Sequence, residues 1–390
     1  MSGTAFLSAS RLQRSALILI ALSLWGCSGA LTLESHPTAL ERINPTSTTV
    51  PLWYKQAQSR VDKWEGSPVI AVEGEQLFIA HPRGRVRALK AECGCRQWDV
   101  ETEAALTGAI GSGNGYLLLG TQKGELLALS TTDGALLWRS ELSSEVVSAP
   151  QLSQGVIVAR TNDGKLFGLN AKNGERLWVY ETTVPSLSLR GVGAPLVVDE
   201  TVFAGFANGK VAALSVSNGK LLWEKVIALA KGRSELERLV DVDAELRYDG
   251  GTLYAVAFQG RLVALDATSG RILWAREFSA HSGIALNERQ LFITDDKEQV
   301  MALDRRTGAT LWRQNKLMRR DLSAPVIHDG KVVVGDYAGY LHWLSFDDGS
   351  FVMRRLLDDA AVVQTPIVVN DTLYAVSRLG SITALRTDAP

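Results

Sequence analysis

Residues 260–274 read GRLVALDATSGRILW, and this phrase of fifteen residues recurs along the chain. Each copy begins with alternating apolar residues, continues through a turn sequence that contains glycine, and ends in a short apolar run closed by tryptophan. Six copies keep the same spacing from glycine to tryptophan. They are the segments 84–98, 124–138, 164–178, 209–223, 260–274 and 298–312.

The phrase has the pattern of two antiparallel strands joined by a tight hairpin, because a run with a period of two precedes the turn residues and a short run ending in tryptophan follows them. Two further apolar runs precede each copy, for example SAPQLSQ and GVIVART before residue 164. Each unit of about 40 residues is therefore predicted to be a four-stranded antiparallel sheet. Such a sheet is apolar on both faces and needs neighbours, which the radial arrangement of a β-propeller provides.

The repeated tryptophan and glycine suggest how neighbouring sheets meet. A large ring on the outermost strand is suited to wedging between two sheets, and a glycine permits both a turn and a close approach of backbone. We therefore expect these two positions to lie at the contacts between blades.

The number of blades follows from the incomplete copies. A seventh copy, 339–353, keeps the spacing but has Met353 in place of tryptophan, and an eighth, 380–390, stops before its last strand. Near the other end, residues 50–56 contain Leu52-Trp53, which is similar to the end of a complete copy. We predict an all-β fold over residues 50–390, an eight-bladed β-propeller of four-stranded antiparallel blades that the N-terminal strand closes.

The first residues have the pattern of an export signal. Arg11 and Arg14 precede the apolar run SALILIALSLW, which is too short to span a bilayer. Residues 1–26 are therefore predicted to be a signal peptide. The end of this run, Leu24-Trp25-Gly26-Cys27, resembles a bacterial lipobox, although a plain secretory signal with an incidental cysteine is the alternative.

The resemblance to a lipobox implies lipidation at Cys27. Residue 28 is serine, where aspartate would favour retention in the inner membrane, so the expected location is the periplasmic face of the outer membrane. Acyl chains on one residue give a stable anchor without a transmembrane helix. Residues 27–49 are polar and interrupted by prolines, and we predict that they form a lipidated tether.

Composition excludes several other functions. A net charge of -1 provides no polybasic character for nucleic acid. Cys93 and Cys95 form a Cys-Gly-Cys sequence that could close a small disulfide, or bind metal if further ligands converged. The five histidines are scattered and none has metal-ligand spacing to another. We expect no metal, no cofactor and no catalytic residues.

Two families resemble this chain. The phrase Ala-Leu-x-x-x-x-Gly-x-x-x-Trp resembles the repeat of pyrroloquinoline-quinone (PQQ) dehydrogenases, and an eight-bladed ring behind a lipoprotein signal resembles the outer-membrane protein assembly factor BamB family. The second resemblance covers essentially the whole mature chain. Because both families share the propeller, the fold does not decide the function.

A PQQ-dependent periplasmic dehydrogenase is the alternative function. The resemblance to that class implies a quinone in the central funnel, calcium held by Glu and Asn, an Asp base and often a disulfide between adjacent cysteines. Here Gly94 separates Cys93 from Cys95, the chain is short for that class, and the repeats offer no obvious acidic cluster. A ring that binds another envelope protein or a cell-wall component is a third possibility.

The connections between blades differ in length. Trp138 precedes Pro150 by 12 residues and Trp312 precedes Pro325 by 13. By contrast, Trp178 precedes Pro195 by 17, and Trp223 precedes Ala244 by 21. The two longest connections are consecutive, so they emerge side by side on one face, where a rigid scaffold usually carries its binding residues.

The resemblance to BamB implies a partner for these loops. The stretches SLSLRG and ERLVDVD look like the BamB segments that contact the periplasmic POTRA domains of BamA, the barrel insertase of the β-barrel assembly machinery (BAM complex). An ion pair from Arg190 to one of the two aspartates, pinning the loops together, is equally compatible with the sequence. Unfolded outer-membrane proteins are a further expected partner, through strand addition to an outer edge. The contact candidates are Leu187, Leu189, Arg190, Asp241 and Asp243.

Overall fold

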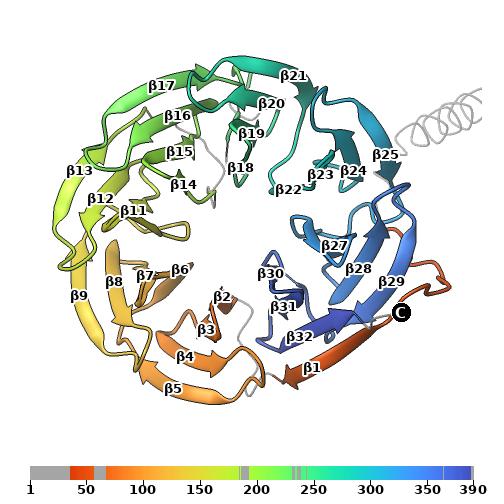
Figure 1. Cartoon of the computed structure of the whole chain (residues 1–390), viewed down its shortest axis with the longest axis horizontal. Helices are drawn as coiled ribbons and strands as arrows, with labels where there is room; N and C mark the ends of the chain where they lie inside the picture. Colours follow the sequence, from red (N-terminus) through yellow and green to blue (C-terminus); the bar gives the residue numbers. More distant parts are fainter. Residues whose placement is uncertain are drawn as a thin grey trace, which may run out of the picture. The chain divides into compact units, whose positions relative to one another are not determined.

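The computed structural model describes residues 36–56, 67–183, 185, 193–230, 233–234, 239–242, 244–362 and 364–387. The predicted signal peptide and Cys27 lie outside these residues. Pro37–Pro390 forms one compact unit, and its strands make a ring of eight four-stranded antiparallel sheets (Figure 1). In the described part of the chain, no helix is long and apolar enough to cross a membrane.

The first four blades follow one another along the chain, from innermost to outermost strand. Blade 1 contains β2 (Val69–Glu73), β3 (Gln76–Ala80), β4 (Arg85–Lys90) and β5 (Arg96–Glu101). Blade 2 contains β6 (Leu106–Gly113), β7 (Tyr116–Thr121), β8 (Glu125–Ser130) and β9 (Leu136–Glu141). Blade 3 contains β10 (Gln151–Ser153), β11 (Val156–Arg160), β12 (Leu166–Asn170) and β13 (Arg176–Tyr180). Blade 4 contains β14 (Leu196–Val198), β15 (Thr201–Gly205), β16 (Lys210–Ser215) and β17 (Leu221–Val226).

The remaining blades complete the ring. Blade 5 contains β18 (Arg247–Asp249), β19 (Thr252–Val256), β20 (Gly260–Asp266) and β21 (Ile272–Phe278). Blade 6 contains β22 (Ile284–Leu286), β23 (Gln290–Thr294), β24 (Val300–Asp304) and β25 (Thr310–Gln314). Blade 7 contains β26 (Val326–His328), β27 (Lys331–Gly335), β28 (Tyr340–Ser345) and β29 (Phe351–Leu356). Blade 8 contains β30 (Ile367–Val369), β31 (Thr372–Val376), β32 (Ile382–Thr387) and β1 (Thr49–Lys55).

The N-terminal strand closes the ring, as the sequence predicted. β1 pairs antiparallel with β32, and Trp53 lies opposite Ala384. Blade 8 is therefore built from both ends of the propeller (Figure 1). The eight-bladed architecture and its closure are both confirmed, and the closure removes the free edge that an open ring would leave.

The core is divided into eight apolar clusters, each shared by two consecutive blades. One cluster joins Phe78 of blade 1 to Leu117 and Leu127 of blade 2. Another joins Trp53 of blade 8 to Leu77 of blade 1. Because each blade buries both faces against neighbours, its strands are apolar on both sides, which explains the near-continuous hydrophobic runs.

Each tryptophan on an outermost strand is hydrogen-bonded to the next blade and packs against it. The indole N–H donates to a backbone carbonyl in the hairpin between the third and fourth strands of the following blade, at 2.7 to 2.9 Å. The ring also lies on the glycine of that hairpin, as the sequence predicted for the contacts between blades. The pairs are Trp53 with Gly94, Trp98 with Gly134, Trp138 with Gly174, Trp178 with Gly219, Trp223 with Gly270, Trp274 with Gly308, and Trp312 with Gly349.

Blade 7 departs from this pattern for a topological reason. In blade 8 the third and fourth strands come from opposite ends of the chain, so no hairpin joins them to receive an indole. Met353 occupies the outer position, and its cross-strand partner is Trp343, where the other blades have alanine or glycine. Trp343 is fully buried and donates to His328 Nδ1 at 3.1 Å. The large side chain has thus moved one strand inward.

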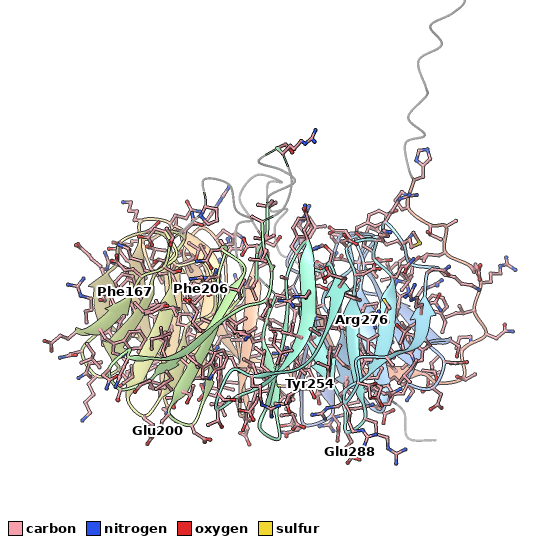
Figure 2. The ribbon with its side chains drawn as sticks, turned by 90° about the horizontal axis from the view of Figure 1, so that it is seen from above. Phe167, Glu200, Phe206, Tyr254, Arg276 and Glu288 are labelled. Atoms are coloured by element: carbon pink, nitrogen blue, oxygen red, sulfur yellow. A yellow bond between two sulfur atoms is a disulfide. The ribbon has the colours of Figure 1, made fainter. Side chains whose placement is uncertain are left out.

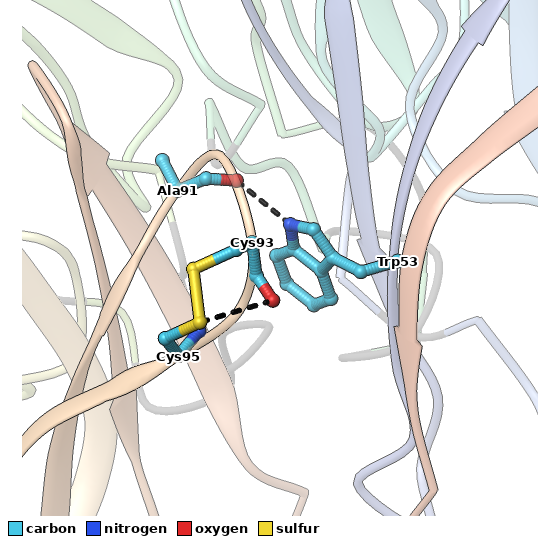
Figure 3. Close-up of a disulfide and its surroundings, with 4 residues drawn as sticks. All are labelled: Trp53, Ala91, Cys93 and Cys95. Atoms are coloured by element: carbon cyan, nitrogen blue, oxygen red, sulfur yellow. Dashed lines mark hydrogen bonds between the residues drawn. A yellow bond between two sulfur atoms is a disulfide. The ribbon is translucent and has the colours of Figure 1, made fainter.

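The Cys-Gly-Cys sequence forms a disulfide in the hairpin that receives Trp53 (Figure 3). In the six other hairpins of this type, the residue before the glycine accepts a hydrogen bond from the backbone N–H of the residue after it. In blade 1 the Cys93 Sγ takes that place, 3.3 Å from the N–H of Cys95. A covalent bridge therefore replaces the polar side chain that shapes the turn elsewhere.

Candidate partner-binding site

Two long loops leave the same face of the ring from consecutive blades. The first long loop, residues 181–195, joins β13 to β14, and the second, residues 227–246, joins β17 to β18. Turns between the second and third strands share this face, whereas turns between the first and second strands lie on the other. Figure 2 shows Glu200 and Glu288, which belong to the latter turns, at the opposite face. We call the face with the two loops the loop face.

The first long loop is held at both of its ends. At its start, the Asn208 side-chain amide donates to Thr182 Oγ1 at 2.8 Å and to the Thr183 carbonyl at 3.2 Å. At its end, the Arg160 guanidinium donates to the Gly193 carbonyl at 3.1 Å. Arg160 is buried and lies over the ring of Phe206, 5.9 Å from its centroid. A buried arginine of blade 3 thus fixes the loop where it enters blade 4.

The second long loop packs into the groove between blades 4 and 5. Its first residues bind blade 4 through the N–H groups of Ile227 and Ala228, which both donate to the Gly209 carbonyl. Its return segment is buried, with Val240 and Val242 in the cluster shared by the two blades. A Cβ on Gly205 would stand 2.3 Å from the Val242 carbonyl oxygen, so only glycine permits this approach.

Of the predicted contact residues, one lies in the described part of the chain. Asp241 is fully buried, and its backbone pairs with Phe258, whose N–H donates to the Asp241 carbonyl at 2.8 Å. It therefore lies at the base of the second long loop and not at its tip. Leu187, Leu189, Arg190 and Asp243 lie outside the described residues, as does the alternative ion pair from Arg190.

The residues that hold the ends of the first long loop were not identified from the sequence. They are Arg160, at the end of β11 in blade 3, and Phe206 and Asn208, in the turn between β15 and β16 of blade 4. The available signal was the arginine that ends the wholly buried strand β11, because a charge in such a position needs a partner. Beside the base of the loops, Leu229 projects into solvent with 63% of its surface exposed.

The central opening of the ring carries paired charges. Glu245, Asp249 and Glu288 line it together with Arg247 and Arg305. Glu245 lies 2.9 Å from Arg247, and Asp249 is paired with Arg305 of blade 6. Within the described ranges, no group of three or more His, Cys, Asp or Glu side chains is placed to hold a metal ion.

Known proteins resemble the chain along almost its whole length. A family model described as outer membrane protein assembly factor BamB matches residues 82–314 and 306–389. A Pseudomonas aeruginosa protein of the same name is 46% identical over 372 residues, which is 95% of this chain and 98% of that protein.

Solved structures give the same fold. The crystal structure of BamB from Moraxella catarrhalis matches with a TM-score of 0.79 and 29% identity, covering 87% of this chain and 100% of that one. Quinohemoprotein alcohol dehydrogenase from Comamonas testosteroni matches with a TM-score of 0.70 at 13% identity, over 89% of this chain and 78% of that one. The second likeness shows a shared propeller alone. The family model and the identity across the full length decide the assignment, and this chain belongs to the BamB family of outer membrane protein assembly factors.

Proposed function

We propose that this chain is a non-catalytic scaffold lipoprotein of the BAM complex, which binds the POTRA domains of BamA and assists the insertion of outer-membrane proteins. The observation that carries the proposal is the pair of adjacent long loops on a rigid ring, each held at its base by hydrogen bonds. A fixed base lets a loop present its tip to a partner with little loss of entropy on binding.

The residues of the proposed interface fall into two groups. Leu187, Leu189 and Arg190 of the first loop, and Asp243 of the second, are proposed to contact the POTRA domains directly. Asp241 is fully buried in this chain. Its proposed role is therefore to hold the second loop in the position that the partner binds.

Membrane attachment is proposed to occur through lipid on Cys27, at the periplasmic face of the outer membrane. The outer rim of the ring is proposed as a second binding surface, for unfolded outer-membrane proteins. Leu137, Leu177 and Leu222 are 48%, 47% and 53% exposed on the outermost strands of blades 2, 3 and 4. Exposed apolar side chains beside an outer strand edge suit the addition of an amphipathic strand.

An affinity pull-down from detergent-solubilised envelopes tests the loop site. BamA is expected to co-purify with the wild-type lipoprotein and to be lost with Arg190→Ala and with Leu187→Ala/Leu189→Ala. Glu200→Ala is the matched control, because this exposed residue lies on the opposite face. All variants are first shown by circular dichroism to be folded.

Two outcomes would contradict the proposal. If wild-type protein never retains BamA, the scaffold function fails, and dye reduction after reconstitution with PQQ and calcium becomes the test of the dehydrogenase alternative. If Glu200→Ala loses BamA as fully as Arg190→Ala, the interface is not at the two loops.

A further inference from the structure

A segment before the first strand lies against blade 7. Residues 37–48, which we call the N-terminal arm, belong to the length that the sequence predicted to be a tether, yet they form hydrogen bonds to the propeller. The Thr38 N–H donates to the Met318 carbonyl at 3.1 Å, and the Thr46 N–H donates to the Val352 carbonyl at 3.0 Å. The arm is therefore bound near one end to the connection that leads from blade 6 into blade 7, and near the other end to blade 7 itself.

Two arginines donate hydrogen bonds to carbonyl groups of the arm: Arg320, in the connection between β25 and β26, and Arg354, on β29. Arg320 donates to the Thr38 carbonyl and Arg354 donates to the Glu41 carbonyl, each at 3.0 Å. A carbonyl that accepts from a guanidinium forms a charge-assisted hydrogen bond, which is stronger than a neutral one. These contacts depend on the backbone of the arm and on two charges of the propeller.

The two arginines are themselves held by a buried pair. Asp336 and His342 are both fully buried, and Asp336 Oδ2 lies 2.9 Å from His342 Nε2. Arg320 reaches the same carboxylate oxygen at 2.8 Å, and Arg354 Nε donates to His342 Nδ1 at 3.0 Å. Buried charges are costly unless they are paired, so this network fixes both guanidinium groups in place.

Side chains of the arm add to the contact. Leu40 packs on the cluster that contains Trp312 and Leu317. Glu41 lies 2.7 Å from Lys316, although this pair is largely exposed and contributes little. The adjacent Ala39 is exposed. Leu40 thus makes an apolar contact with the propeller, and its neighbour Ala39 is exposed to solvent.

The course of the arm defines where the preceding chain leaves the ring. Met318 belongs to the connection between β25 and β26, an outermost and an innermost strand, and this connection lies on the loop face. Val352 lies on β29, at the outer rim. The arm therefore starts on the loop face and descends over blade 7 to β1. Blade 7 is opposite blade 3 in a ring of eight.

We propose that the docked arm sets the orientation of the propeller on the membrane, with the loop face turned toward the lipid surface. This inference rests on the proposed lipidation of Cys27. From Cys27 to Pro37 there are ten residues, which span at most roughly 35 Å when extended. With the arm released, the free length from Cys27 to Thr48 spans roughly 70 Å, and either face can approach the lipid.

Hydrogen exchange on the full chain tests the docking. Leu40→Asp removes the apolar contact from the arm and leaves the buried network of blade 7 untouched, while Ala39→Asp places the same charge at the exposed neighbour. We expect amides within 37–48 to exchange about tenfold faster in Leu40→Asp than in Ala39→Asp, with β29 equally protected in both. Equal exchange in the two variants would show that the arm is not docked through Leu40.

Energy transfer on vesicles tests the orientation. Lipidated protein is bound to phosphatidylethanolamine and phosphatidylglycerol vesicles that carry an acceptor lipid, with a donor dye at Lys123→Cys or at Glu200→Cys. Lys123 is an exposed residue in a turn on the loop face, and Glu200 lies on the opposite face. We expect more transfer from position 123 than from position 200, and expect Leu40→Asp but not Ala39→Asp to abolish this difference.

The outcomes separate the inference from the proposed function. Protein that does not bind vesicles at all contradicts the lipid anchor. Protein that binds but gives equal transfer from both positions, or more from position 200, contradicts the orientation while the anchor stands.

Discussion

Trp138 of blade 2 lies directly on Gly174 of blade 3. A methyl group added to Gly174 would stand 2.5 Å from indole Cε3, and the backbone there has a φ of +71°. The indole N–H donates to the Ala171 carbonyl of the same turn at 2.8 Å. The turn of one blade therefore serves as the receptor for the side chain of another, and glycine is required there for two independent reasons.

The first prediction separates these two reasons. Gly174→Ala should lower the free energy of unfolding by about 2–5 kcal/mol, because backbone strain adds to a clash with Trp138. Gly155→Ala in the same blade is the control, since its φ is +76° and nothing lies within 4 Å of the added carbon. It should cost about 1–2 kcal/mol. Urea unfolding of both variants measures the difference, and equal losses would show that the indole contact contributes nothing.

The second prediction concerns Trp343 and Met353 of blade 7, where the tryptophan lies on the third strand instead of the outermost strand. Trp343→Ala should cost about 3–5 kcal/mol through the cavity it leaves, and Met353→Trp about 1–3 kcal/mol through overpacking. The double variant copies the residue pair of other blades such as blade 2, with alanine on the third strand and the indole on the outer strand. We expect it to lose less stability than the sum of the two single changes. A double-mutant cycle in urea checks this, and strict additivity would mean that the two positions do not share one volume.

The third prediction concerns the disulfide. Cys93→Asp/Cys95→Ala copies the Asp133-Gly-Ala135 turn of blade 2, in which the Asp133 carboxylate accepts from the Ala135 N–H at 3.1 Å. This variant should be about 1 kcal/mol more stable than Cys93→Ala/Cys95→Ala, which has neither the bridge nor the polar acceptor. Unfolding without reductant measures both. Identical midpoints would indicate that the turn needs no side-chain support to receive Trp53.

The fourth prediction is a dependence of stability on pH. Burial lowers the pKa of His342 despite its hydrogen bond to Asp336, and burial likewise lowers the pKa of His328. Both are therefore neutral in the folded chain at neutral pH. In the unfolded chain each takes up a proton below about pH 6.5, so stability should fall from pH 7 to pH 5, by at most about 2 kcal/mol per histidine.

The Asp336 carboxylate, which is hydrogen-bonded to His342, affects stability in a lower pH range. Burial alone would raise the pKa of Asp336, but the hydrogen bonds that its carboxylate accepts from His342, the Tyr340 backbone and Arg320 outweigh burial, and the pKa is lowered. Its contribution is present above about pH 3.9 and is lost only as the pH falls below that value. His342→Gln should thus be less stable than wild type at pH 7 but lose less between pH 7 and pH 5. Urea unfolding at the two pH values measures this. If the free energy of unfolding falls as much between pH 7 and pH 5 in the variant as in the wild type, His342 is not a source of the pH dependence.

The fold was predictable from the sequence because each blade is a local unit. The two strands of a copy such as 260–274 are joined by a short turn, so their spacing and alternation are visible within fifteen residues. Closure was predictable as well, since Leu52-Trp53 supplies the ending that the last copy lacks. The inference of eight blades required only counting these units.

The site was less predictable than the fold. Loop length identified two adjacent loops on one face, but not the side chains beneath them, because Arg160 and Gly193 lie 33 residues apart and meet only in the ring. Asp241 looked like a surface residue in a polar stretch, and the structure buries it. The proposed contacts at Leu187, Leu189, Arg190 and Asp243 remain predictions of the sequence.

The sequence by itself determined the blades, their number and the strand that closes them, since these follow from short-range patterns repeated along the chain. Only the tertiary structure decided which tryptophan binds which glycine, why Trp343 and Met353 exchange places, and that residues 37–48 lie on blade 7. Each of these is a contact between residues far apart in the chain. Such contacts depend on the ring having closed, and a pattern within one copy carries no information about its neighbour.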